Sequence, residues 1–250
     1  AENIDAPITA GALQPETLHW VDRVLEQAKV KQKKVIGFMH HAVLENFPGH
    51  ADLLPEFIID DFENISKNLA QSGLSLMLTG HTHVQDATFK AWNDGSYILD
   101  IQTGSLATFP HPCRVIRICG GLLKITSRSI VLPGNFHGLE FASYSQSFTE
   151  ISLNHKAENM GLGWPLDNIF VHATWSHMIG DEHPSPETLQ TISILQNSPL
   201  HVLQTAGAYL DAVWDATYQA DNDCLVFLPW DTSQYIKLLK SFLHKYRRIQ

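Results

Sequence analysis

The sequence is poor in cysteine, in basic residues and in long apolar runs. Its 3 cysteines, Cys113, Cys119 and Cys224, have no zinc-ribbon spacing, so buried free thiols are expected. No run approaches the roughly 20 apolar residues of a membrane helix, so no membrane span is expected in this chain. Asp and Glu outnumber Lys and Arg by 26 to 17, which leaves a formal net charge of -9. This balance argues against nucleic acid or an anionic membrane as the main partner, so no nucleic-acid-binding surface is expected.

No signal-peptide pattern begins at Ala1 either. If the chain is a fragment, that absence says nothing about export, so the chain is expected to be soluble and its compartment is left open. The composition is 44% hydrophobic and 17% charged, which is typical of a folded chain. A length of 250 residues allows one large domain or one and a half ordinary ones.

The most informative stretch is Gly80-His81-Thr82-His83, which follows the apolar run of residues 74–79. A short run of large apolar residues bounded by glycines predicts a buried strand. Residues two apart in an extended backbone point to the same side, so both imidazoles can face one small volume. Neutral imidazole is a good ligand for zinc, iron, nickel, copper and cobalt, so this strand end is a candidate metal site.

A second stretch repeats this design. The apolar residues 35–39 predict another short strand, and they end at a pair of histidines that begins with His40. A helical apolar pattern over residues 62–69 can cross between the two strands, which makes them parallel neighbours. Open α/β sheets place ligands at the carboxyl ends of their strands, so His40, His81 and His83 are expected to converge there.

These segments resemble a known family. The stretches FMHHAVLEN and LMLTGHTHVQD, followed by IQTGSLATFP, are similar to those of the calcineurin-like metallophosphoesterases, which include purple acid phosphatases and phosphodiesterases. The resemblance covers roughly residues 13 to 131 and depends on the same motif at two successive strand ends. It implies an α/β fold, in which a β-α-β unit and an antiparallel meander form part of an α/β/β/α sandwich.

The resemblance also implies a function. Members of the family hydrolyse phosphomonoesters or phosphodiesters with a hydroxide held between two divalent or trivalent metal ions, such as Mn, Fe, Zn, Co or Ni. It implies that His40 and His81 bind one metal ion and that His83 binds the other. His41 would then act beside the metals, on the side of the phosphoester substrate.

The remaining motifs of the family's metal site are D-x-H, G-D and G-N-H-[DE], and none of them precedes His40 here. Two late partial copies, Asp181-Glu182-His183 and the Gly134–His137 stretch, follow no strand of the expected kind. The simplest expectation is that the chain is the C-terminal part of a longer protein. Its partners would be the N-terminal half or a companion chain, and a homo-oligomer is a further option.

The loop from residue 42 to residue 55 leaves the predicted metal edge. Loops at such edges commonly carry function, so Asn46 and His50 are candidates for lining a substrate cleft. His111 lies between two prolines, after the Gly-Ser turn. It is a further candidate for reaching this cleft.

Beyond His83 the sequence predicts first hairpins and then helices. Two hairpins are expected beyond His83, over residues 86–92 with 96–102 and over residues 114–118 with 122–130. A break at residues 133–135 divides the chain into a sandwich part, 1–132, and a mainly helical region, 133–250, whose last helix is expected over residues 236–243.

Three functions remain open at this stage. The chain can be part of a metal-dependent phosphoesterase whose other ligands lie elsewhere. It can be a non-catalytic binding or assembly module with a degenerate site. It can also be a different, mononuclear metal hydrolase completed by late carboxylates such as Asp181. His172 and His183 are expected to lie outside the main site.

Overall fold

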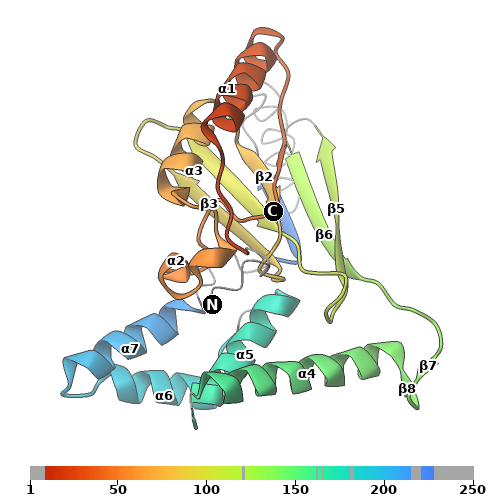
Figure 1. Cartoon of the computed structure of the whole chain (residues 1–250), viewed down its shortest axis with the longest axis vertical. Coiled ribbons are helices and arrows are strands. Elements are labelled where there is room, and N and C mark those ends of the chain that lie inside the picture. Colours follow the sequence, from red (N-terminus) through yellow and green to blue (C-terminus); the bar gives the residue numbers. More distant parts are fainter. Residues whose placement is uncertain are drawn as a thin grey trace, which may run out of the picture.

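The computed structural model describes residues 9–119, 122–161, 163–164, 166–180, 183–214 and 221–227. In this part of the chain, two larger sheets and three helices lie at the top of Figure 1, and four helices, α4 to α7, lie along the bottom. The expected α/β class is confirmed. None of the described helices is long and apolar enough to cross a membrane.

The first sheet has four strands in the order β1-β2-β4-β3. Its strands are β1 (Gly37–Phe38), β2 (Leu76–Thr79), β3 (Asp86–Ala91) and β4 (Tyr97–Gln102). β2 is parallel to both β1 and β4, and β3 folds back antiparallel on β4. The predicted β-α-β unit is therefore present, and so is the hairpin at Asn93-Asp94-Gly95. Gly95 has a φ of 83°, a backbone conformation that glycine adopts without steric cost.

Three helices and a 3-10 turn accompany the first sheet, and they are α1 (Pro15–Val30), α2 (His50–Leu53), η1 (Pro55–Phe57) and α3 (Phe62–Gln71). Pro15 begins α1 because its missing N–H would be unpaired in the first turn anyway. Leu25 of α1 and Leu69 of α3 share one core with Met77 and Ile98 of the sheet. The helices therefore cover one face of this sheet.

A second sheet packs on the opposite face. Its strands are β5 (Pro112–Cys119), β6 (Leu122–Ser129) and β9 (Asp223–Phe227). Leu76 and Leu99 are neighbours in sequence of Met77 and Ile98, yet they point the other way, as alternation along a strand requires. They form a core with Leu123 of β6, which is fully buried. β9 was not predicted, because a run of four apolar residues after a helical region fits a buried strand and a helix segment equally well.

The region after residue 133 is mainly helical, as expected. It consists of the short strands β7 (Asn135–Phe136) and β8 (Leu139–Glu140) and the helices α4 (Phe141–Met160), α5 (Leu166–Ile179), α6 (Pro186–Gln196) and α7 (His201–Ala212). The chain then returns to the sandwich part, because β9 pairs with β6. The helix expected over residues 236–243 lies outside the described residues.

Polar contacts join the helices to the sheets. The N–H of Gln85 donates to the carbonyl of His177 on α5 at 2.9 Å. Nδ2 of Asn222, just before β9, donates to the carbonyl of Ile179 at 2.6 Å. These bonds place the end of α5 next to the loop that carries His83.

Candidate functional site

The parallel strands β1 and β2 bring histidines to one edge of the first sheet. Beyond the strands their pairing continues, because the N–H of Met39 donates to the carbonyl of Leu78 at 3.1 Å. The N–H of Gly80 then donates to the carbonyl of His40 at 3.0 Å. The carboxyl ends of parallel strands meet at one edge, so His40 and His81 become neighbours although 41 positions separate them.

Three imidazole rings pack together at this edge, and we call His40, His41 and His81 the histidine cluster. Nε2 of His40 lies 2.9 Å from Nδ1 of His81, so one nitrogen donates a hydrogen bond to the other. The ring centroid of His81 is 4.6 Å from that of His40 and 4.3 Å from that of His41. On their outer sides, Nε2 of His41 lies 2.7 Å from the carbonyl oxygen of Thr9, and Nε2 of His81 lies 3.2 Å from that of Glu56.

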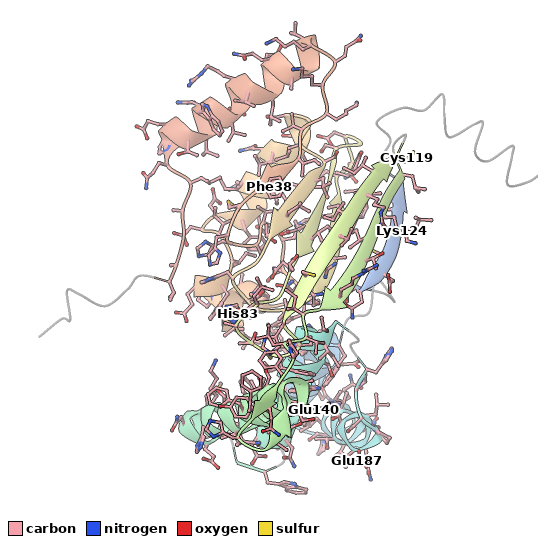
Figure 2. All side chains as sticks on the ribbon, turned by 90° about the vertical axis from the view of Figure 1, so that its right-hand side faces the viewer. Phe38, His83, Cys119, Lys124, Glu140 and Glu187 are labelled. Carbon is pink, nitrogen blue, oxygen red and sulfur yellow. The ribbon has the colours of Figure 1, made fainter. Side chains whose placement is uncertain are left out.

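His83 lies on the same loop, with an exposed side chain at the lower end of the first sheet (Figure 2). Partial burial lowers the pKa of His83, and the nearby charges of Lys156 on α4 and of His40 lower it further. Burial, His41 and His40 likewise lower the pKa of His81. Both imidazoles are therefore neutral at pH 7, which is the form that binds metal.

The loop holds an unfavourable backbone conformation. His81 has a φ of 74° and His83 a φ of 60°, in the left-handed region that side chains other than glycine rarely adopt. Each such residue costs on the order of 1–3 kcal/mol, and such strain clusters at binding and catalytic sites. Thr82 between them donates from its hydroxyl to Oε1 of Gln102, which holds the loop against β4.

His40 and His81 face each other at hydrogen-bond distance, slightly closer than two ligands of one tetrahedral metal ion would lie. Nitrogen ligands lie about 2.0–2.1 Å from zinc, whose usual geometry is tetrahedral, so two of them are about 3.3–3.4 Å apart. The observed separation between the two nitrogens is 2.9 Å. Among the described residues, no group of three or more His, Cys, Asp or Glu side chains is arranged to hold a metal ion. Further ligands for such an ion would come from water, from substrate or from other residues.

Asp100 of β4 supports the segment that follows the histidine pair. One carboxylate oxygen accepts hydrogen bonds from the N–H groups of Val43 (2.7 Å) and Leu44 (3.3 Å), and the other accepts one from the hydroxyl of Thr79 (2.5 Å). Burial raises the pKa of Asp100 to about 7, although these three hydrogen bonds lower it. The sequence did not single out Asp100, because an acidic residue inside a strand pattern gives no sign of which groups it meets.

Asn46 and His50 lie against the sheet. Nδ2 of Asn46 donates to the carboxylate of Asp86, and its Oδ1 accepts from Nε2 of Gln102 at 2.8 Å. His50 is 0% exposed, and its ring stacks on Phe47 with centroids 5.2 Å apart. This position of His50 differs from the expected place on a cleft wall. The loop folds inward because the buried carboxylate of Asp86 needs donors, and Asn46 supplies one.

The burial of His50 predicts an acid-sensitive fold. Burial and the nearby His177 lower the pKa of His50 from 6.5 to about 4, so the folded state excludes a proton that the unfolded chain binds. The contribution of His50 to the free energy of unfolding is therefore largest above pH 6.5. It falls by about 3 kcal/mol as the pH drops from 6.5 to 4.

The variant His50→Gln cannot take up this proton. Between pH 7 and pH 5 its free energy of unfolding, measured by urea denaturation, is expected to fall by about 2 kcal/mol less than that of the wild type. His155→Gln is the control, because its side chain is 70% exposed. Equal losses in His50→Gln and the wild type would contradict the prediction.

The other singled-out histidines have local partners. Nε2 of His111 lies 2.6 Å from the hydroxyl of Ser145 on α4, so this buried residue ties the loop after β4 to the helices. His172 packs on Trp214 with ring centroids 5.2 Å apart. Asp181 lies outside the described residues.

Lys156, whose charge acts on His83, was also missed, because nothing in a helical sequence shows that it faces a distant loop.

A scan against protein-family models and a search of curated proteins found no match for this chain. The role of the histidines is therefore inferred from their chemistry and from the two motifs that carry them.

Proposed function

We propose that this chain is the histidine-bearing part of a metal-dependent phosphoesterase similar to the calcineurin-like metallophosphoesterases. One observation carries the proposal: the two histidine motifs end adjacent parallel strands, and Nε2 of His40 lies 2.9 Å from Nδ1 of His81. A small outward shift of the two rings would let both nitrogens bind one tetrahedral ion. The strained backbone of His81 and His83 supports it, because such strain is kept where a site needs it.

The arrangement of layers also supports the proposal. Helices α1 and α3 cover one face of the first sheet and the second sheet covers the other, an order that agrees with part of the α/β/β/α sandwich implied by the resemblance. In Figure 1 the strand β2, which ends two residues before His81, lies between these layers. A functional site at the carboxyl ends of its parallel strands agrees with the usual position of ligands in α/β sheets.

In the proposed site His40 and His81 hold one metal ion, and His83 binds a second. Two such ions supply positive charge for the phosphoryl oxygens and a hydroxide at neutral pH. Neutral imidazoles bind the ions without cancelling this charge, which matters in a chain of net charge -9. His41 lies beside the pair, where it can hydrogen-bond to a phosphoester substrate. Asp100 keeps the segment after His41 in place.

The ligands absent from this sequence would come from another segment, on the same protein or on a companion chain. The edge strand β1 supports this part of the proposal. Phe38 is 77% exposed, and within the described residues β1 has β2 as its single neighbour. An uncovered aromatic side chain on a free strand edge is a typical place for a further segment to pair. A second copy of this chain could also occupy it.

The experiment is a hydrolysis assay with p-nitrophenyl phosphate and bis-p-nitrophenyl phosphate, with Mn²⁺, Zn²⁺ or Co²⁺ supplied. We expect residues 1–250 alone to hydrolyse these esters slowly or not at all, and a longer protein that carries the missing motifs to hydrolyse them in a chelator-sensitive way. Robust turnover by residues 1–250 alone would show that this chain holds all the ligands. Metal binding without turnover by the longer protein would instead identify a non-catalytic module.

A further inference from the structure

A separate pocket of about 570 Å³ lies between helices α4, α5 and α6. This volume is within the range of small-molecule sites, which is about 300–1,000 Å³. Side chains of all three helices line it, and so does Trp164 from the connection between α4 and α5. Figure 2 labels Glu187, one of the lining residues, in the lower part of the view, on α6.

Two tryptophans and His172 are the aromatic side chains that line the pocket. Trp164 is 81% exposed, which is unusual for the largest apolar side chain and leaves its ring open to a ligand. Trp175 of α5 is held in place, because its ring stacks on Phe109 with centroids 5.2 Å apart and planes 13° apart. Aromatic faces carry negative electrostatic potential, so such walls attract organic cations.

The charged groups of the pocket have one sign. Glu150 of α4 and Glu187 of α6 are among its lining residues, and no lysine or arginine is among those that the structure describes there. Hydrogen bonds from its own N–H and from Ser185 lower the pKa of Glu187, so its carboxylate is ionised at pH 7. Among the described residues neither lining carboxylate has an ion pair with lysine or arginine, and the nearby His172, another lining residue, further lowers the pKa of Glu187.

A local role accounts for only one of these carboxylates. Glu187 lies in the first turn of α6, where the helix dipole favours an acidic residue. Glu150 lies in the middle of α4, where the dipole has no effect, and its one hydrogen-bonded side-chain partner is the neutral Gln146 at 3.2 Å. The amides of Asn154 and Asn168 add neutral polar groups to the same wall.

We propose that this pocket binds a small organic cation with an amine or quaternary ammonium group, held against Trp164 and Trp175 and neutralised by Glu150 and Glu187. The proposal does not depend on the histidine cluster or on phosphoesterase activity. An anion would meet two carboxylates there, and a purely apolar ligand would make no favourable contact with either of them.

Isothermal titration calorimetry with choline tests the proposal, with 3,3-dimethyl-1-butanol as a neutral ligand of the same shape. We expect choline to bind at least about tenfold more tightly than the alcohol, because cation–π and charge interactions are absent from the latter. Trp164→Ala and Glu187→Gln are each expected to weaken choline binding about fivefold or more. Trp20→Ala and Glu158→Gln, which change exposed residues outside the pocket, serve as matched controls and should bind as the wild type does.

The same cation is also offered on phosphatidylcholine vesicles. Binding to vesicles as well as to choline would assign the pocket to a lipid headgroup, and binding of free choline alone would assign it to a soluble cation. No binding of choline, equal binding of the neutral alcohol, or unchanged affinity in both pocket variants would overturn the proposal.

Discussion

Replacing His81 with alanine is expected to weaken Co²⁺ or Zn²⁺ binding by about 100-fold or more. The loss of groups that only orient a ligand already costs about 10–100-fold in metal affinity, and His81 is proposed as a ligand itself. Its imidazole is one half of the 2.9 Å nitrogen pair with His40, and burial keeps its pKa below the usual value. Protons therefore compete with the metal less than they do at an ordinary imidazole.

Titration calorimetry and the visible absorption of bound Co²⁺ measure this effect, in residues 1–250 and in any longer protein that shows phosphoesterase activity. In the latter, His81→Ala should also abolish most of the metal-dependent turnover. His155→Ala is the matched control, since this histidine lies on α4 and its side chain is 70% exposed. Unchanged metal affinity in His81→Ala, with the thermal midpoint of unfolding preserved, would contradict the proposed metal site.

Replacing Asp100 with asparagine is expected to make the stability of the protein less dependent on pH. Burial raises the folded-state pKa of Asp100 to about 7, above the unfolded value of 3.8, so the folded protein retains a proton that the unfolded chain releases. The stabilisation from this proton is complete below pH 3.8 and is lost as the pH rises to 7. Between pH 5 and pH 8 the loss amounts to about 3 kcal/mol.

An asparagine cannot lose this proton, and its amide can still accept from Val43 and donate to the hydroxyl of Thr79. Relative to the wild type, the free energy of unfolding of Asp100→Asn should therefore rise by about 3 kcal/mol between pH 5 and pH 8, as measured by urea denaturation. Asp94→Asn is the control, because hydrogen bonds to Ser96 and Gln71 lower the pKa of Asp94 to about 2 and its charge is constant in this range. A pH-independent difference for Asp100→Asn would contradict the prediction.

Asp100 also supports the backbone next to the histidine cluster. Its carboxylate links Thr79, at the end of β2, to Val43 and Leu44, which lie two and three positions after His41. Asp100→Ala would leave two buried N–H groups without an acceptor, each at a cost of about 1–3 kcal/mol. We therefore expect this variant to lose stability at every pH, unlike the asparagine variant, and a comparison of the two separates charge from hydrogen bonding.

Most of the local structure could be predicted from the sequence. The apolar run before Gly80 forms β2, the pattern over residues 62–69 forms α3, and Asn93-Asp94-Gly95 forms a hairpin turn. In each of these cases the signal and its cause lie within a few residues: an apolar face, a helix stop or a glycine that adopts positive φ. The sequence also predicted that His40 and His81 are neighbours, because a β-α-β unit determines which strand ends meet.

What the tertiary structure decided is which distant groups meet, because burial and hydrogen-bond partners depend on the whole fold. The sequence could place His50 on a loop but could not show that the loop folds inward to satisfy Asp86. It could place Asp100 on a strand but not against Val43 and Leu44. Nor could it show that β9 returns to the second sheet, since a partner 97 positions away leaves no local pattern, as the pairing of Asp223 with Thr126 illustrates. Local periodicity is determined by nearby residues, whereas pairing, burial and pKa are determined by contacts that exist only after the chain has folded.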